Sequence, residues 1–272
     1  MNMEAPREEG RLAIRATVPE ALWEQNDRFA QSLRSNLLRH PISAHPVREF
    51  FESGVMSRPK QLNLHLEFGY GFAQIFTDAV LNAMATATQL ENRLGPRAKV
   101  TARFLWALNL SDELGYVPSG NTASYAGHPN SAHYFQYVEM FPKLGAKENA
   151  ILHHDATPMA RAARKTFEEN YQDYALLTTV LALSESVFDK YAGSWADNVA
   201  RSENIDTKKG YHSIHVQHDD GHSVDDDHSE DSWTLVKQAL TPERYEEIEA
   251  KCEAWLDIWA QFADHVMSSS TD

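Results

Sequence analysis

Two histidines and one aspartate lie close together in the stretch from Tyr211 to His222: His215, Asp219 and His222 itself. In a helix, residues four and seven positions apart share one face, because the helix has about 3.6 residues per turn. Two imidazoles and a carboxylate on one face are a ligand set suited to iron, manganese or zinc. If the stretch is helical, it therefore predicts part of a metal site.

The same region also offers competing ligand sets. The chain has 13 histidines, and His212, His218 and His228 surround the first trio. His218 and His222 form another pair one helical turn apart, which Asp225 could join. A histidine-rich loop that binds metal only weakly is the plainer interpretation. The sequence by itself leaves the two interpretations open.

Two glutamates elsewhere adjoin apolar residues. Glu185 shares a helical stripe with Leu181 and Phe188, and burial of an unpaired carboxylate costs several kcal/mol. A bound metal would justify that position, and a buried salt bridge is the alternative. Glu113 ends a second apolar helix, with Asp112 beside it on a different face. Taken alone, Glu113 is better explained as an exposed acid at a helix end.

A further histidine, His133, opens a third predicted helix and shares a stripe with Tyr137 and Leu144. A single histidine in such a place is usually half-buried and structural. It becomes a candidate ligand only if the fold brings it to the two glutamates.

Helices must position these side chains. Along the chain, stretches with helical periodicity are separated by prolines and glycines, which mark the starts and ends of helices. Gly69 and Gly71 lie inside a long predicted helix, where each costs about 1 kcal/mol against alanine. Either another helix approaches the backbone there, or the helix bends. Helices are predicted over residues 19–38, 46–53, 59–91, 97–114, 131–144, 158–191 with a break near 170, and from 242 onward, with a loop over 115–130.

The last helix has the strongest pattern, a continuous apolar seam with steps of three and four. The seam consists of Tyr245, Ile248, Cys252, Trp255, Trp259, Phe262 and Val266. Cys252 is therefore expected to be a buried core residue, and no catalytic nucleophile is predicted. No long stretch alternates with period two. We predict an all-α fold with one domain over residues 18–268, preceded by a flexible N-terminal tail, residues 1–17.

Composition and charge argue against several classes of function and partner. The chain has 272 residues, 42% of them hydrophobic, and a formal net charge of -14. This charge argues against nucleic acid as a partner, since such proteins usually carry a basic face. No apolar run approaches the roughly 18 residues of a membrane span, and the polar N-terminus lacks the apolar region of a signal peptide. One cysteine excludes an internal disulfide framework, so we expect a cytoplasmic protein.

Taken in order, these segments resemble the haem-oxygenase-like diiron oxidases and oxygenases. The resemblance lies in Asn109-Leu-Ser-Asp-Glu-Leu-Gly115, in Ala132-His133, in Ala182-Leu-Ser-Glu185, and in His215-x3-Asp219-x2-His222. It covers most of the chain, and the final triplet is its specific part. It implies a helical bundle of about seven core helices that holds two Fe(II) ions. The implied ligands are Glu113, His133, Glu185, His215, Asp219 and His222.

The resemblance also leaves choices within the ligand set. Glu185 is the implied bridge between the irons. The spacing from Glu113 to His133 is longer than the family pattern, so His128 competes for the histidine role, and we prefer His133 because it lies on a helix. A ferritin-like site would need Glu-x-x-His twice, and this sequence has no such motif.

The implied activity is an O2-dependent oxidation of a small amino acid or amine, in natural-product biosynthesis. N-oxygenation, desaturation and oxidative C–C cleavage through a peroxo-diferric intermediate are all compatible with the family. An external electron donor and a homodimer are also compatible with the family. Residues expected at the substrate are Glu67, Tyr70, Arg103, Tyr137 and Tyr174, although a structural acid at a helix kink is the better interpretation of Glu67.

Two other classes of function remain open. The same fold supports metal-free catalysts, such as thiamin-degrading or quinone-forming enzymes, which use a cysteine or histidines. A non-catalytic helical domain that binds metal or another protein is the second alternative. Oxygen consumption on addition of ferrous iron and candidate amines separates these classes.

Overall fold

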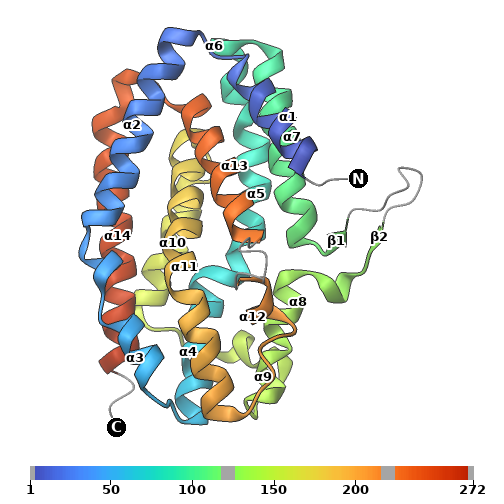
Figure 1. Cartoon of the computed structure of the whole chain (residues 1–272), viewed down its shortest axis with the longest axis vertical. Coiled ribbons are helices and arrows are strands. Elements are labelled where there is room, and N and C mark those ends of the chain that lie inside the picture. The colour runs from blue at the N-terminus through green and yellow to red at the C-terminus, as the bar shows by residue number, and fades with distance from the viewer. Residues whose placement is uncertain (1–3, 118–125, 216–223, 269–272) are drawn as a thin grey trace.

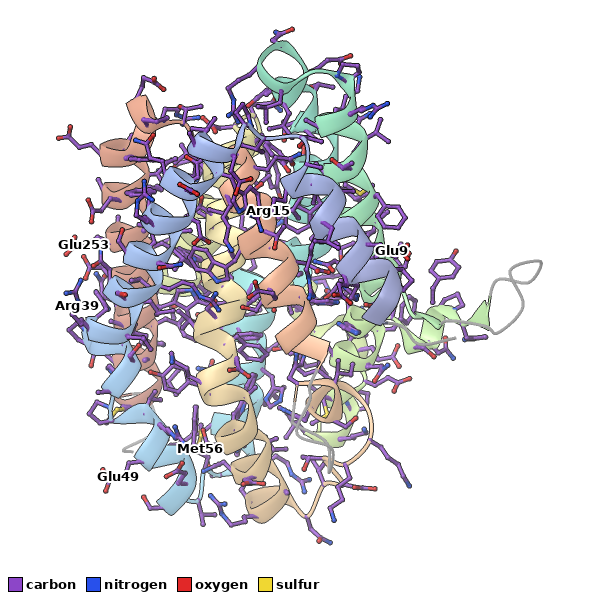
Figure 2. The ribbon with its side chains drawn as sticks, turned by 45° about the horizontal axis from the view of Figure 1, so that its top comes forward. Glu9, Arg15, Arg39, Glu49, Met56 and Glu253 are labelled. Carbon is purple, nitrogen blue, oxygen red and sulfur yellow. The ribbon has the colours of Figure 1, made fainter. Side chains whose placement is uncertain are left out.

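The computed structural model describes residues 4–117, 126–215 and 224–268, and most of them lie in helices (Figure 1). The prediction of an all-α, single-domain fold is confirmed. Charged side chains such as Arg39 and Glu253 point outward from the bundle (Figure 2). No helix in these described ranges is long and apolar enough to cross a membrane.

The first half of the chain supplies the helices on two sides of the bundle. Its elements are α1 (Glu4–Arg15), α2 (Glu20–Arg39), η1 (Pro41–Ala44), α3 (Val47–Ser53), α4 (Arg58–Phe68), η2 (Gly69–Ala73), α5 (Gln74–Thr86), η3 (Ala87–Leu90), α6 (Glu91–Leu94) and α7 (Pro96–Glu113).

The second half supplies the central helices and the remaining wall. Its elements are β1 (Tyr116–Val117), β2 (Ala126–Gly127), η4 (Pro129–Ser131), α8 (His133–Val138), α9 (Met140–Lys143), η5 (Glu148–His153), α10 (Pro158–Asn170), α11 (Tyr174–Glu203), α12 (Tyr211–Ile214), α13 (Val224–Ala239), η6 (Pro242–Arg244) and α14 (Tyr245–Ser268).

Helix α11 runs through the middle of the bundle and contacts α3, α5, α10, α13 and α14 (Figure 1). Its first turn is capped by Asp173, whose carboxylate accepts a hydrogen bond from the Leu176 amide at 3.1 Å, as helix N-caps commonly do. Residues on several sides of α11 are buried, among them Leu177, Leu181 and Val187. A helix that is apolar nearly all round must lie inside the protein.

The predicted seam of the last helix is confirmed. Helix α14 buries Ile248, Trp255 and Trp259, and Cys252 lies among them at 5% exposure. These side chains face α2, α3, α10 and α11. The seam therefore joins the two sides of the bundle across a single core.

The predicted long helix from residue 59 is interrupted where its glycines lie. Helix α4 ends at Phe68, a π-helical turn, η2, follows, and α5 then begins at Gln74. A Cβ atom at Gly69 would lie 2.8 Å from Tyr137, and one at Gly71 would lie 3.1 Å from the Ala160 carbonyl oxygen of α10. The expected close approach of a second helix is confirmed at Gly71. The helix is also interrupted, by a π-helical turn.

The prediction of a loose tail over residues 1–17 is wrong. Residues 4–15 form α1, which lies against α7 and α13. Ile14 and Arg7 are buried, whereas Glu9 and Arg15 point outward (Figure 2). Hydrophobic periodicity does not predict this helix, because Ile14 is the one large apolar side chain among the three residues of 6–15 that are buried, Arg7, Gly10 and Ile14.

The predicted loop after α7 contains a small antiparallel pairing, in which Tyr116 lies opposite Gly127 and Val117 opposite Ala126. Gly115 and Gly127 adopt positive φ angles of 79° and 142°, which favour glycine. The pairing holds the residues that follow α7 beside those that precede α8. It thereby places His133 beside Glu113.

Candidate metal centre

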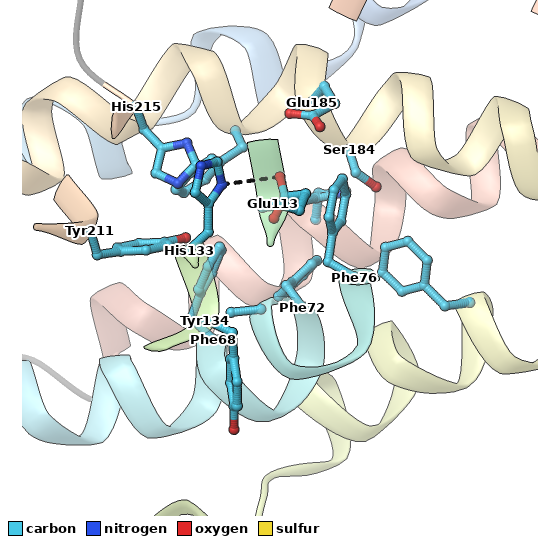
Figure 3. A pocket seen from close by; sticks show the side chains of 14 residues that line it. Phe68, Phe72, Phe76, Glu113, His133, Tyr134, Ser184, Glu185, Tyr211 and His215 are labelled. Atoms are coloured by element: carbon cyan, nitrogen blue, oxygen red, sulfur yellow. Dashed lines mark ion pairs between the residues drawn. The ribbon is translucent and has the colours of Figure 1, made fainter. Parts of the chain in front are cut away.

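Four of the six predicted ligands line one cavity (Figure 3). Glu113 comes from the end of α7, His133 from the start of α8, Glu185 from the middle of α11, and His215 from the residue after α12. All four predicted segments thus contribute a side chain to this cavity, although they are far apart in the sequence. The other two predicted ligands, Asp219 and His222, lie outside the described residues.

A fifth side chain, His228 in the first turns of α13, completes a compact cluster with the two glutamates. Its Nδ1 atom lies 3.8 Å from Glu113 Oε1 and 3.8 Å from Glu185 Oε1. One ligand atom from each of the three residues lies within 4.8 Å of the others, and all three residues are buried. His228 belonged to the histidine cluster in the sequence, but its spacing did not single it out.

His133 approaches the same carboxylate from another side. Its Nδ1 atom is 3.1 Å from Glu113 Oε1, yet among the described residues it has no hydrogen-bond partner of acceptable geometry. The His133 ring lies 5.7 Å from the His215 ring and 6.5 Å from the His228 ring. His128, the competing candidate, is exposed, and its ring accepts a hydrogen bond from the Asn130 amide.

The charges of the cluster stabilise one another. Burial raises the pKa of Glu113, but His133, His228 and His215 lower it by more, so the net pKa lies below the usual value. Burial lowers the pKa of His228, but hydrogen bonds to Asp112 and Glu185 and the two glutamate charges raise it well above the usual value. The carboxylates therefore require a positive charge between them, which protonated His228 supplies when no metal is bound.

These observations fit a divalent metal ion. The buried Nδ1 atom of His133, the two acidic side chains and the imidazole of His228 are nitrogen and oxygen donors of the kind that iron, manganese and zinc accept. A metal at this position would take over the neutralising role of the His228 proton, and its binding would release that proton.

Most of the other residues in the cavity wall are aromatic, and Ala73 and Ser184 are the exceptions among the described lining residues (Figure 3). Among the described lining residues of the cavity there is neither arginine nor lysine. The rings come from α4, η2, α5, α10, α11 and α14 and belong to Phe68, Phe72, Phe76, Phe167, Phe188 and Trp259. We call this space the inner chamber.

A second, larger cavity adjoins the inner chamber. It lies between α5, α8 and the residues that follow α7. Glu113 and Tyr134 line both cavities, whereas Asp78 and His128 line only the outer one. We call it the outer chamber, and Tyr134 stands at the boundary between the two.

The residues predicted to bind substrate do not line the inner chamber. The Glu67 carboxylate is buried against His154 Nε2 at 2.5 Å and accepts the Thr157 amide at 3.1 and 3.2 Å. Glu67 thus fixes the segment before α10. This is a structural role, the alternative that the sequence also favoured for this acid. Arg103 donates to the Met84 carbonyl oxygen at 2.8 Å and holds the end of α5.

The three predicted tyrosines lie elsewhere too. Tyr137 is buried, and its hydroxyl donates to the His65 carbonyl oxygen. Tyr174 is buried at 1% exposure in the first turn of α11. The Tyr70 ring lies under the guanidinium of Arg164 at 5.0 Å. None of the five predicted substrate residues is among those that line the inner chamber.

Cys252 takes no part in the cavity wall. It is buried in α14, and burial raises the pKa of its thiol to about 12. A thiol with this pKa is almost entirely protonated at neutral pH and is a poor nucleophile.

Comparison with known proteins identifies the fold. No family model matches the sequence, and no curated protein does. A TenA homologue from Pseudomonas syringae pv. tomato is 13% identical with a TM-score of 0.58, over 90% of this chain and 93% of that one. A CADD-like protein from Nostoc punctiforme is 12% identical with a TM-score of 0.63, over 92% and 100%.

A third similar structure is described by the name of its fold. It is a domain of unknown function with a haem-oxygenase-like fold from Shewanella denitrificans, 12% identical with a TM-score of 0.56, over 93% of each chain. The similarity extends over nearly the full length in all three cases. The present chain therefore has the haem-oxygenase-like fold, as the sequence resemblance implied.

Proposed function

We propose that this haem-oxygenase-like protein is a non-haem diiron enzyme that uses O2 to oxidise a small amine. The observation that carries the proposal is the buried group of Glu113, Glu185 and His228 at the wall of an aromatic chamber. Two adjacent acids would be costly to bury without a cation between them. N-oxygenation, desaturation and oxidative C–C cleavage are the reactions under consideration.

The residues that would hold the metal are Glu113, Glu185 and His228, with His133 and His215 close by. Asp219 and His222 remain proposed ligands from the segment outside the described residues. Ferrous iron bound to these donors would supply electrons to O2. The protein's own contribution is to keep the acids ionised and to exclude water with the surrounding rings.

The walls also select the substrate. A free amino acid carries a carboxylate, for which a binding site usually provides an arginine or lysine, and the described lining of the inner chamber provides neither. Aromatic rings favour an apolar body. The nitrogen would lie toward Glu113, which faces both chambers. Amines with an alkyl or aryl body therefore fit the chamber better than free amino acids.

Oxygen consumption tests this function. Protein reconstituted with Fe(II) without oxygen is mixed with air-saturated buffer and a panel of alkyl and aryl amines, with free amino acids alongside. We expect faster O2 uptake and an oxidised product, seen by mass spectrometry, with at least one apolar amine. Glu185→Gln is expected to abolish both, whereas Asp78→Asn, which changes an exposed acid of the outer chamber, retains O2 uptake.

A metal-free catalyst is the second candidate function, and the similarity to a TenA homologue favours it. The raised pKa of Cys252 argues against a thiol mechanism, so such an enzyme would depend on acid–base chemistry by His133 or His215. Turnover that persists in the presence of a strong chelator and without O2 would support this candidate and contradict the first.

A further inference from the structure

The N-terminal helix brings an arginine to the edge of the candidate metal centre. Arg7 in α1 is only 3% exposed. Its Nη1 atom donates to Asn109 Oδ1 at 2.6 Å and to Asp231, and its Nη2 atom donates to Asp112. These partners lie on α7 and α13, so one side chain joins the helix that ends in Glu113 to the helix that carries His228.

Asp112 connects this arginine to the cluster. Its Oδ2 atom, which Arg7 contacts, also lies 3.1 Å from His228 Nε2. The other nitrogen of the same ring, Nδ1, faces Glu113 and Glu185. A proton on Nε2 that is donated to Asp112 leaves Nδ1 free to bind a metal. Carboxylates that accept a hydrogen bond from a ligating histidine fix its tautomer and ring orientation in this way.

Asp231 forms a second connection between α1 and α13, the helix that carries His228. It lies three residues after His228, is 0% exposed, and accepts Arg11 Nε at 2.6 Å as well as the bond from Arg7. Two arginines of α1 thus neutralise two acids, one beside Glu113 and one beside His228. Without Arg7, Asp112 would lose the cation that balances its charge and the bond that sets its orientation.

We infer that α1 controls the metal centre through Arg7, a positioning residue that orients His228 by way of Asp112. The inference rests on the proposed function only in that the cluster binds a metal. Helix α1 belongs to the metal-binding unit, and its removal lowers metal affinity. The plain alternative is that Arg7 merely fastens α1 to the bundle.

Arg11 provides the matched control that separates these alternatives. It also comes from α1 and pairs with Asp231 on α13. Arg11→Ala removes an ion pair of α1 but leaves Arg7 in contact with Asp112. If Arg7 only fastens the helix, the two alanine variants lower metal affinity to a similar extent. If Arg7 positions His228, only Arg7→Ala lowers it strongly.

Cobalt(II) binding to the full-length chain tests the inference without relying on activity. The visible absorbance of bound Co²⁺ reports its coordination, and competition with a chelator gives its affinity. We expect Arg7→Ala to weaken binding about 10- to 100-fold, the usual effect of losing a partner of a ligating histidine. Arg7→Lys, which keeps the charge but cannot span both acids, is expected to recover part of the affinity, and Arg11→Ala to stay close to wild type.

The outcomes are distinguishable. A folded Arg7→Ala protein with wild-type cobalt affinity and spectrum overturns the inference, and so does equal weakening by Arg11→Ala. If Arg7→Ala does not fold, the comparison of Arg7→Lys with Arg11→Ala decides the question, and equal affinities overturn the inference. A wild-type protein that binds no cobalt overturns both the inference and the proposed function.

Discussion

Glu113, Glu185 and His228 show how single residues define the candidate site. Each alone has an ordinary explanation, as a helix-end acid, a salt-bridged acid and a histidine in a charged cluster. Together they place two carboxylates within 3.8 Å of one imidazole nitrogen, in a buried place where an unbalanced charge costs several kcal/mol. A cation between them removes that cost, whether it is a proton on His228 or a metal ion.

Replacement of His228 separates this cluster from the other histidines. His228→Ala is expected to weaken Fe(II) or Co(II) binding at least about 100-fold, since changes to the partners of a ligand already cost 10- to 100-fold. Equilibrium dialysis with metal analysis measures the effect. His128→Ala, at an exposed histidine of the outer chamber, is the control and should bind metal normally. Equal metal content in the two variants would rule out His228 as a ligand.

His65 and His212, a pair of histidines outside this cluster, should make the free energy of unfolding depend on pH. His65 Nε2 lies 3.1 Å from His212 Nε2, and burial lowers the pKa of His65 to about 4. Between about pH 6.5 and pH 4 the unfolded chain binds a proton at this residue and the folded chain does not. The free energy of unfolding should therefore fall by up to about 3 kcal/mol as the pH falls through this window, and be fully regained above pH 6.5.

Urea denaturation at a series of pH values measures this slope. In His65→Gln the slope between pH 6.5 and pH 4 should become shallower, because the group that resists protonation in the folded state is gone. An unchanged slope would mean that other groups cause the acid sensitivity.

The interrupted helix α4–η2–α5 shows what the elements contribute. Ala at Gly69 would bring a methyl group within 2.8 Å of both Ile151 and Tyr137, so neighbouring side chains must move. We expect Gly69→Ala to destabilise the protein by about 1–3 kcal/mol, as overpacked cores usually do. Urea denaturation monitored by circular dichroism measures the change.

Gly193 is the matched control within a helix. It lies inside α11, and apart from its chain neighbours and the backbone of its own helix no atom lies within 4 Å of the position that a Cβ would take. Gly193→Ala should therefore stabilise the protein by about 0.5–1 kcal/mol through the lower conformational freedom of the unfolded chain. A stabilising Gly69→Ala would contradict the close approach described above.

Most elements could be predicted from the sequence, and the exceptions have physical reasons. The seam of α14 was predictable because its burial depends on apolar side chains with helical spacing. Helix α1 was not, because its contacts with α7 and α13 include the ion pairs of Arg7 and Arg11, and buried ion pairs leave no hydrophobic pattern. The partner acids, Asp112 and Asp231, are more than 100 residues away from Arg7.

The candidate site was predictable in part for a similar reason. Glu113, His133, Glu185 and His215 were identified by their order along the chain and do meet in one cavity. His228 was passed over because several histidines in one stretch offer several registers, and only the fold decides which ring faces the acids. The residues expected at the substrate remain an untested prediction, but they do not line this cavity. Glu67 and Arg103 instead form hydrogen bonds with nearby backbone groups.

At the scale of the whole molecule, the fold and the activity are separate questions. Solved structures only 12–13% identical to this chain share its fold over nearly their full length. A common helical frame therefore tolerates almost complete sequence change, and function depends on the side chains that face the cavity. In this chain those side chains are acids, imidazoles and aromatic rings.

Metal binding should stabilise the whole molecule, because the ligands come together only in the folded state. Ferrous or cobalt ion at about 100 times its dissociation constant adds about 2.7 kcal/mol, which corresponds to a rise in melting temperature of about 5–10 °C for a protein of this size. Differential scanning fluorimetry under nitrogen measures it. The Glu113→Gln/Glu185→Gln protein should show no rise, and an equal rise there would place the bound metal elsewhere.

The position of the metal itself is the central claim. Crystals soaked with ferrous iron in the absence of oxygen, measured by anomalous diffraction at the iron absorption edge, locate it directly. We predict anomalous density between the carboxylates of Glu113 and Glu185, within coordination distance of His228 Nδ1. Iron bound only by surface histidines, or no anomalous density at this cluster in fully soaked crystals, would contradict the account.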